Sequence, residues 1–98
     1  MKALLVVAHG SRRASSNDEV RALTQVVAQR AGGTYDKVAC AFLELADPLI
    51  PAGVEALIED GAERVTVVPY FLSAGRHVVE DIPAEVAKAR VPEGVEVT

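Results

Sequence analysis

The sequence contains little of several residue types on which other classes of protein depend. Its 98 residues include one cysteine, one methionine, two tyrosines, two phenylalanines and no tryptophan. The single cysteine, Cys40, excludes an internal disulfide, and because it lies in an apolar run we expect a small core residue and a cytoplasmic location. No apolar run approaches the ~20 residues that a membrane span requires, so no contact with a membrane is expected.

The chain also lacks an excess of positive charge. Its formal net charge is −4 and its calculated pI is about 5.1. An acidic surface does not attract nucleic acid or an anionic membrane, so neither is expected as the main partner. A small soluble ligand or another protein is the expected partner.

Half of the residues are hydrophobic, and apolar runs alternate with segments of helical periodicity. The apolar runs predict strands at residues 3–8, 38–42, 65–68 and 95–98. The first helix is expected to open at a capping box, Ser16 to Glu19, and to stop at Gly32-Gly33. The second helix is expected to run from near Asp47-Pro48 to Gly61. The third is expected to cover about His77 to Ala89, with Pro83 bending it or marking its true start.

This alternation predicts the α/β class, with a small open parallel sheet of about four strands and flanking helices joined by right-handed crossovers. The last predicted strand has no helix after it. Because a doubly wound sheet covers both faces with helices, some apolar sheet surface should be bare. Either a partner covers that surface or the chain is a short version of a longer domain.

Polar residues with catalytic side chains follow three of the predicted strands. His9 comes directly after the first strand, Glu44 follows the second, and His77 ends the loop after the third. Ligands of open parallel sheets bind beyond the carboxyl ends of the strands, so we expect these three side chains to converge. Two imidazoles and a carboxylate suit Zn²⁺, Co²⁺, Ni²⁺ or Fe²⁺, and the same groups can accept protons.

The residues beside His9 each allow two interpretations. Gly10 permits a sharp turn, and it also lets a flat ligand approach the backbone. Ser11 either hydrogen-bonds locally or holds a ligand carboxylate and orients His9. Arg12 and Arg13 are either solvated surface charges or bidentate partners of ligand carboxylates.

Four stretches together resemble the small class II tetrapyrrole chelatases, the sirohydrochlorin cobaltochelatase family of the CbiX type. They are "LLVVAHGSRR" with "SN" shortly after it, "AFLELADPLI", "GAERVTVVPYFLSAGRHVVEDIP" and "GVEV". The resemblance implies that His9 and His77 handle the metal. Similarity to the acidic residue of related chelatases adds Glu44.

The resemblance also implies an activity and an assembly. Members of the family insert a divalent metal into sirohydrochlorin, on routes to cobalamin, sirohaem or a nickel tetrapyrrole; the metal is a substrate, with cobalt expected first and nickel or iron as alternatives. The many carboxylates of sirohydrochlorin give Arg12, Arg13 and Arg76 a docking role. A homodimer is implied, as is a single domain, residues 1–98, without the helix that small members carry after the last strand.

Two alternatives remain from the residues. The first is a non-catalytic module that binds metal or tetrapyrrole without turnover. The second is a phosphate-handling enzyme with His9 as nucleophile, although Ala8 stands where an arginine is expected for that type.

Overall fold

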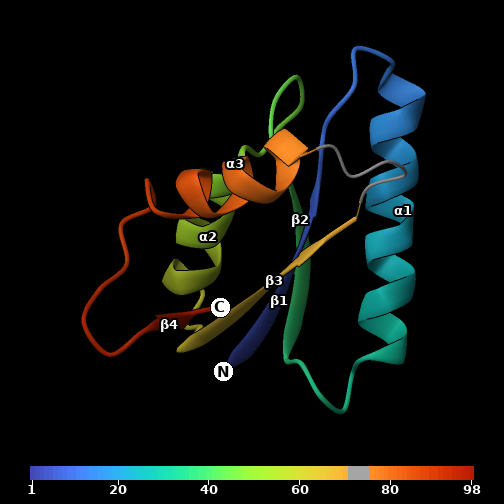
Figure 1. The fold of residues 1–98 in the computed structure, drawn as a ribbon. Helices are drawn as coiled ribbons and strands as arrows, with labels where there is room; N and C mark the ends of the chain where they lie inside the picture. The colour runs from blue at the N-terminus through green and yellow to red at the C-terminus, as the bar shows by residue number, and fades with distance from the viewer. Residues whose placement is uncertain (71–75) are drawn as a thin grey trace.

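A parallel sheet forms the centre of the protein (Figure 1). The computed structural model describes the backbone of residues 1–70 and 76–98 and the side chains of residues 1–70 and 80–98. Within these residues the strands are β1 (Lys2–Ala8), β2 (Lys37–Phe42), β3 (Arg64–Pro69) and β4 (Glu96–Val97). Their order is β2-β1-β3-β4, and every neighbouring pair is parallel. The predicted α/β class with a small open parallel sheet is confirmed, although β4 is shorter than the predicted 95–98.

The helices alternate with the strands along the chain, and their starts differ from the predicted ones. They are α1 (Ala14–Arg30), α2 (Ile50–Glu59) and α3 (Arg76–Val86). The predicted capping box is wrong, because the N-cap residue of α1 is Arg13 and Ser16 lies inside the helix. Helix α2 begins at Ile50 rather than near Asp47-Pro48, with Pro51 in its first turn, where no backbone N–H is needed. Pro83 lies inside α3 and does not mark its start.

The helices lie on both faces of the sheet (Figure 1), with α1 on one face and α2 and α3 on the other. Side chains alternate between the faces along each strand, so every second residue of β1 faces α2 and α3. This face carries the main apolar core, whose buried members are Ala3, Leu5, Val7, Ala41, Ile50, Val54, Leu57, Ala62, Val65 and Ile82. The helices of the described residues include none long and apolar enough to cross a membrane.

The face of the sheet that α1 covers is less completely buried. Val65 and Val67 of β3 belong to the core beneath α2 and α3, so Val68 points to the opposite face, where it is 41% exposed. Tyr70, two residues on, is exposed to a similar degree. Val68 in β3 and Tyr70 just after it are therefore exposed, and the bare apolar surface expected from the sequence stays a prediction.

Candidate functional site

The carboxyl ends of β1 and β2 bring His9 and Glu44 together. The strands pair in register up to Ala8 and Phe42, and two more main-chain bonds continue the pairing: Leu43 N–H donates to Ala8 O at 2.9 Å and Glu44 N–H donates to His9 O at 3.1 Å. Beyond this ladder, His9 Nε2 lies 3.1 Å from Glu44 Oε1. The predicted convergence of these two side chains is thus observed, while their role stays a prediction.

The exposure of this pair argues against a purely structural role. The side chains of His9 and Glu44 are 52% and 56% exposed. An ion pair at this degree of exposure contributes about 0–1 kcal/mol to stability, so folding gains little from it. Both groups are accessible to a ligand arriving from solvent.

The separation of the two atoms suits a shared divalent cation. An imidazole nitrogen and a carboxylate oxygen that each lie about 2.1 Å from one cation are about 3.0 Å apart when the angle between them is a right angle. The observed 3.1 Å between His9 Nε2 and Glu44 Oε1 is an ordinary hydrogen-bond distance, and a cation bound by both groups at a right angle would need little change in their separation. Nitrogen and oxygen donors together suit borderline metals such as cobalt, nickel and iron.

Gly10 allows the two loops that carry this pair to touch. It has a φ of +93°, in the region that favours glycine, and a Cβ built on it would lie 1.7 Å from the main-chain oxygen of Glu44. A side chain at position 10 would therefore push the loops apart. Of the two interpretations of Gly10, the structure supports a steric requirement, and the contact is with Glu44 itself.

Ser11 is engaged locally, whereas the two arginines extend into solvent. The Ser11 Oγ accepts a hydrogen bond from Arg13 N–H at 3.0 Å, which is the local bond that the sequence allows. Arg12 and Arg13 are exposed, and among the ion pairs of the described residues neither takes part. Both lie beside His9 in the chain, so they remain available to carboxylates of a ligand.

For His77, the third predicted metal ligand, the structure describes the backbone and not the side chain. His77 and Arg76 begin α3, after the carboxyl end of β3, but their side chains lie outside the described residues. Among the side chains that are described, no group of three metal ligands gathers. The structure therefore unites His9 with Glu44 and leaves the contributions of His77 and Arg76 as predictions.

Two residues of α1 that sequence reasoning missed reach this region. Asn17, which is 7% exposed, bonds to the main chain of Ser11, and Arg21 bonds to the main chain of Asp47 in the loop after β2. The signal in the sequence for Asn17 was the "SN", Ser16-Asn17, that follows "LLVVAHGSRR" in the family resemblance. The bonds that Asn17 and Arg21 make depend on the fold, which that motif does not reveal.

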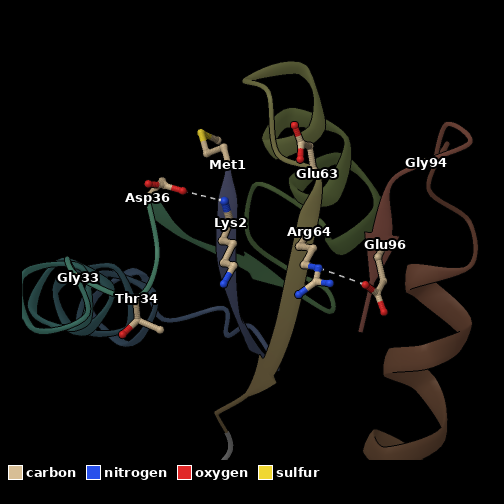
Figure 2. Close-up of a pocket in the computed structure, with 9 residues that line it drawn as sticks. All are labelled: Met1, Lys2, Gly33, Thr34, Asp36, Glu63, Arg64, Gly94 and Glu96. Carbon is tan, nitrogen blue, oxygen red and sulfur yellow. Dashed lines mark hydrogen bonds and ion pairs between the residues drawn. The ribbon is translucent and has the colours of Figure 1, made fainter.

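A large cavity among the described residues lies at the opposite end of the sheet (Figure 2). It measures about 710 Å³, and its lining includes Lys2, Asp36, Arg64 and Glu96. Two of its carboxylates have partners: Glu96 Oε2 lies 3.3 Å from Arg64 Nε, and Asp36 Oδ2 accepts a hydrogen bond from the main-chain N–H of Lys2 at 2.8 Å. It is lined by no histidine and lies at the amino ends of the strands, so size alone does not make it the site of metal chemistry.

Comparison with known proteins points to one family. The family model for CbiX matches residues 3–98. A sirohydrochlorin cobaltochelatase from Methanocaldococcus jannaschii is 40% identical over 83 residues, which cover 85% of this chain and 57% of that protein. A sirohydrochlorin ferrochelatase from Priestia megaterium is 40% identical over 88 residues, which cover 90% of this chain and 32% of that protein.

A solved structure agrees in fold. The sirohydrochlorin chelatase SirB from Bacillus subtilis subspecies spizizenii, determined in complex with cobalt, superposes with a TM-score of 0.76 and 36% identity. The match covers 89% of this chain and 36% of that one. The chain thus spans only part of the relatives it matches, 57% of the methanogen protein and less of the others.

Proposed function

The chain belongs to the CbiX family, and we propose that it is a lyase that inserts a divalent metal into sirohydrochlorin. The observation that carries the proposal is the exposed pair of His9 and Glu44, with its 3.1 Å separation, at the carboxyl ends of adjacent parallel strands. Both relatives described above are sirohydrochlorin chelatases by name.

Metal insertion sets three chemical tasks. Water must leave the cation, two pyrrole N–H protons must leave the macrocycle, and the four nitrogens must take the metal over. A neutral imidazole and one carboxylate, His9 and Glu44, replace water around the cation while leaving positions for the macrocycle. We assign His77 to the same metal-handling set, because it lies at the start of α3, which follows the carboxyl end of β3.

Proton removal requires an acceptor near the metal. When the cation passes from the protein to the macrocycle, the imidazole of His9 and the carboxylate of Glu44 release it. The lone pairs that bound the cation then become available to a proton. Each is then able to accept a proton from a pyrrole N–H. Their exposure of 52% and 56% lets those protons pass on to solvent.

Arginines near the site are assigned to docking of the tetrapyrrole. Arg12 and Arg13 follow His9 and are exposed, and Arg76 precedes His77. Guanidinium groups bind carboxylates bidentately, and sirohydrochlorin carries many carboxylates. The Ser11 hydroxyl, whose oxygen accepts from Arg13 N–H, keeps its own hydrogen to donate to one of them.

Cobalt is the metal that we propose first, with nickel and iron as alternatives. The methanogen relative is named for cobalt, and the SirB structure was determined with cobalt, whereas the Priestia relative is named for iron. Mixed nitrogen and oxygen ligands bind all three metals, so cellular supply contributes to the choice. With cobalt, the product belongs to a route toward cobalamin.

We also propose one domain over residues 1–98, a homodimer and a cytoplasmic location. The exposure of Val68 and Tyr70 supports a partner, and a 20.6 kDa species, twice the 10.3 kDa of the chain, is expected in sedimentation. A species of 10.3 kDa alone at micromolar concentration would contradict the dimer. The free thiol of Cys40 supports a reducing compartment, and cell fractionation tests the location.

The test of the proposed activity is an insertion assay with sirohydrochlorin and Co²⁺, Ni²⁺ or Fe²⁺ in turn, followed through the absorption spectrum of the tetrapyrrole. A rate above that of the uncatalysed reaction, greatest with Co²⁺, is expected. A rate equal to the uncatalysed one with every metal overturns the proposal. Saturable binding of metal or tetrapyrrole in calorimetry without any turnover would identify a binding module instead.

A further inference from the structure

Helix α1 buries polar side chains where a core helix normally buries apolar ones. Across α1, all of whose side chains are described, the buried residues are Asn17 and Thr24, at 7% and 6% exposure. Thr24 is satisfied within the helix, because its Oγ1 donates to Val20 O at 2.8 Å. Asn17 instead reaches outside the helix, so its burial calls for a different explanation.

The amide of Asn17 fixes the loop that carries His9. Its Oδ1 accepts from Ser11 N–H at 2.9 Å, and its Nδ2 donates to Ser11 O at 2.8 Å. The Asn17 side chain thereby binds both the N–H and the carbonyl oxygen of Ser11, which sets the position and the orientation of Ser11. Ser11 is two residues from His9, so this bond pair determines where the chain leaves β1.

Arg21, one helical turn after Asn17, fixes the loop that carries Glu44. Its Nη2 donates to Asp47 O at 2.9 Å, and its guanidinium carbon lies 5.2 Å from the centre of the Phe42 ring. Phe42 ends β2 and Asp47 follows Glu44 by three residues, so these contacts hold both sides of Glu44. Asp18 Oδ1, 2.9 Å from Nη1, holds the guanidinium in this orientation.

Residues four apart lie on one face of a helix, so Asn17 and Arg21 present a single surface to both loops. The loops also contact each other through Glu44 N–H and His9 O. A shift of either loop therefore changes the separation of the His9 and Glu44 side chains. The hydrogen bonds that Asn17 and Arg21 make to the two loops are to the main chain of Ser11 and Asp47, not to the side chains of His9 and Glu44.

We propose that Asn17 and Arg21 are positioning residues that hold the His9 loop and the Glu44 loop at the separation that metal delivery requires. This inference rests on the proposed chelatase function. It explains why α1 buries an amide beside the site. It predicts that loss of the clamp lowers turnover by more than it weakens tetrapyrrole binding, because the arginines assigned to docking are all retained. Residues that orient metal ligands typically change activity by about 10- to 100-fold when they are removed.

The experiment compares Asn17→Ala and Arg21→Gln with Thr24→Ala, which removes the other buried polar side chain of α1 without touching either loop. Amide hydrogen exchange of Ser11 and Glu44 is measured in the free protein, and kcat and KM are measured for cobalt insertion. In Asn17→Ala, we expect faster exchange at both amides and a kcat that is about 10- to 100-fold lower. The change in the KM for sirohydrochlorin should be smaller, although Ser11, which Asn17 holds, is itself assigned to docking. Thr24→Ala should lower the melting temperature and leave kcat and both amides unchanged.

Conservative variants keep the test decisive if Asn17→Ala fails to fold. Asn17→Asp retains the acceptor for Ser11 N–H and loses the donor to Ser11 O, and Arg21→Lys retains one donor, so both should recover part of the lost turnover. A kcat for folded Asn17→Ala or Asn17→Asp equal to that of Thr24→Ala overturns the inference. If the wild-type protein inserts no metal, the proposed function fails, and the positioning is still decided by exchange. Unchanged Ser11 and Glu44 amides in Asn17→Ala, or an unchanged Glu44 amide in Asn17→Asp, overturn it.

Discussion

Both ends of the sheet carry charged groups, and the two ends arrange them differently. At the carboxyl end, His9 and Glu44 meet in the open, on loops that touch through Gly10. At the amino end there is a cavity of about 710 Å³, yet Arg64 is paired with Glu96 across β3 and β4 (Figure 2). The comparison teaches that a large cavity and a meeting of potential metal ligands occur at different ends of one sheet, and the proposed site follows the ligands.

The largest expected effect separates the two ends by activity. His9→Ala should lower the rate of cobalt insertion by about 100-fold or more, because it removes a metal ligand and a proton acceptor. Lys2→Ala, at the amino end and facing the large cavity, is the matched control and should leave the rate unchanged. If Lys2→Ala inserts cobalt as slowly as His9→Ala in the same assay, the proposed difference between the two ends is contradicted.

A pair of glycines separates the two ends by packing. Gly10 and Gly94 have φ values of +93° and +90°, but a Cβ on Gly94 meets nothing within 4 Å. Gly94→Ala should cost about 1–2 kcal/mol for the left-handed backbone alone. Gly10→Ala should cost more, because forced overpacking adds about 1–3 kcal/mol, and it should also slow insertion. Urea unfolding measures the free energy of unfolding of both variants. Equal losses of stability would show that contact with Glu44 O is unimportant.

A smaller effect is expected at the arginine beside His9. Arg13→Ala should raise the KM for sirohydrochlorin about fivefold, since an accessible charge-assisted contact contributes about 1 kcal/mol, and should leave kcat unchanged. Arg30→Ala, at the other end of α1, is the control with the same loss of charge. Equal KM changes in both variants would indicate a general effect of net charge rather than docking at Arg13.

The smallest effect should come from the ion pair at the amino end. Glu96→Gln removes the partner of Arg64, and because both side chains are more than half exposed the loss of stability should be about 0.2–1 kcal/mol. Cobalt insertion should be unaffected. Thermal unfolding and the insertion assay measure the two quantities, and slower insertion would place the amino end within the functional machinery.

The sequence was sufficient for the features that depend on short-range pattern. Apolar runs located β1 to β3, and their polar ends located His9 and Glu44, because parallel strands align their carboxyl ends. The predicted start of α1 was wrong, because Ser16 has the spacing of a cap residue but lies inside the helix, which begins at Ala14. Asn17, in the first turn, bonds to the main chain of Ser11 instead. The clamp by Asn17 and Arg21 depends on contacts across the fold, which no local pattern encodes.

The central claim is that His9 and Glu44 act as one metal-delivery site. Its most direct test is the rate of cobalt insertion by the wild-type protein, His9→Ala, Glu44→Gln and the double variant. Because residues that act as a unit are strongly non-additive, the double variant should be about as slow as the slower single variant. If the two losses multiply, or if neither single variant is slower than the wild-type protein, the claim is contradicted.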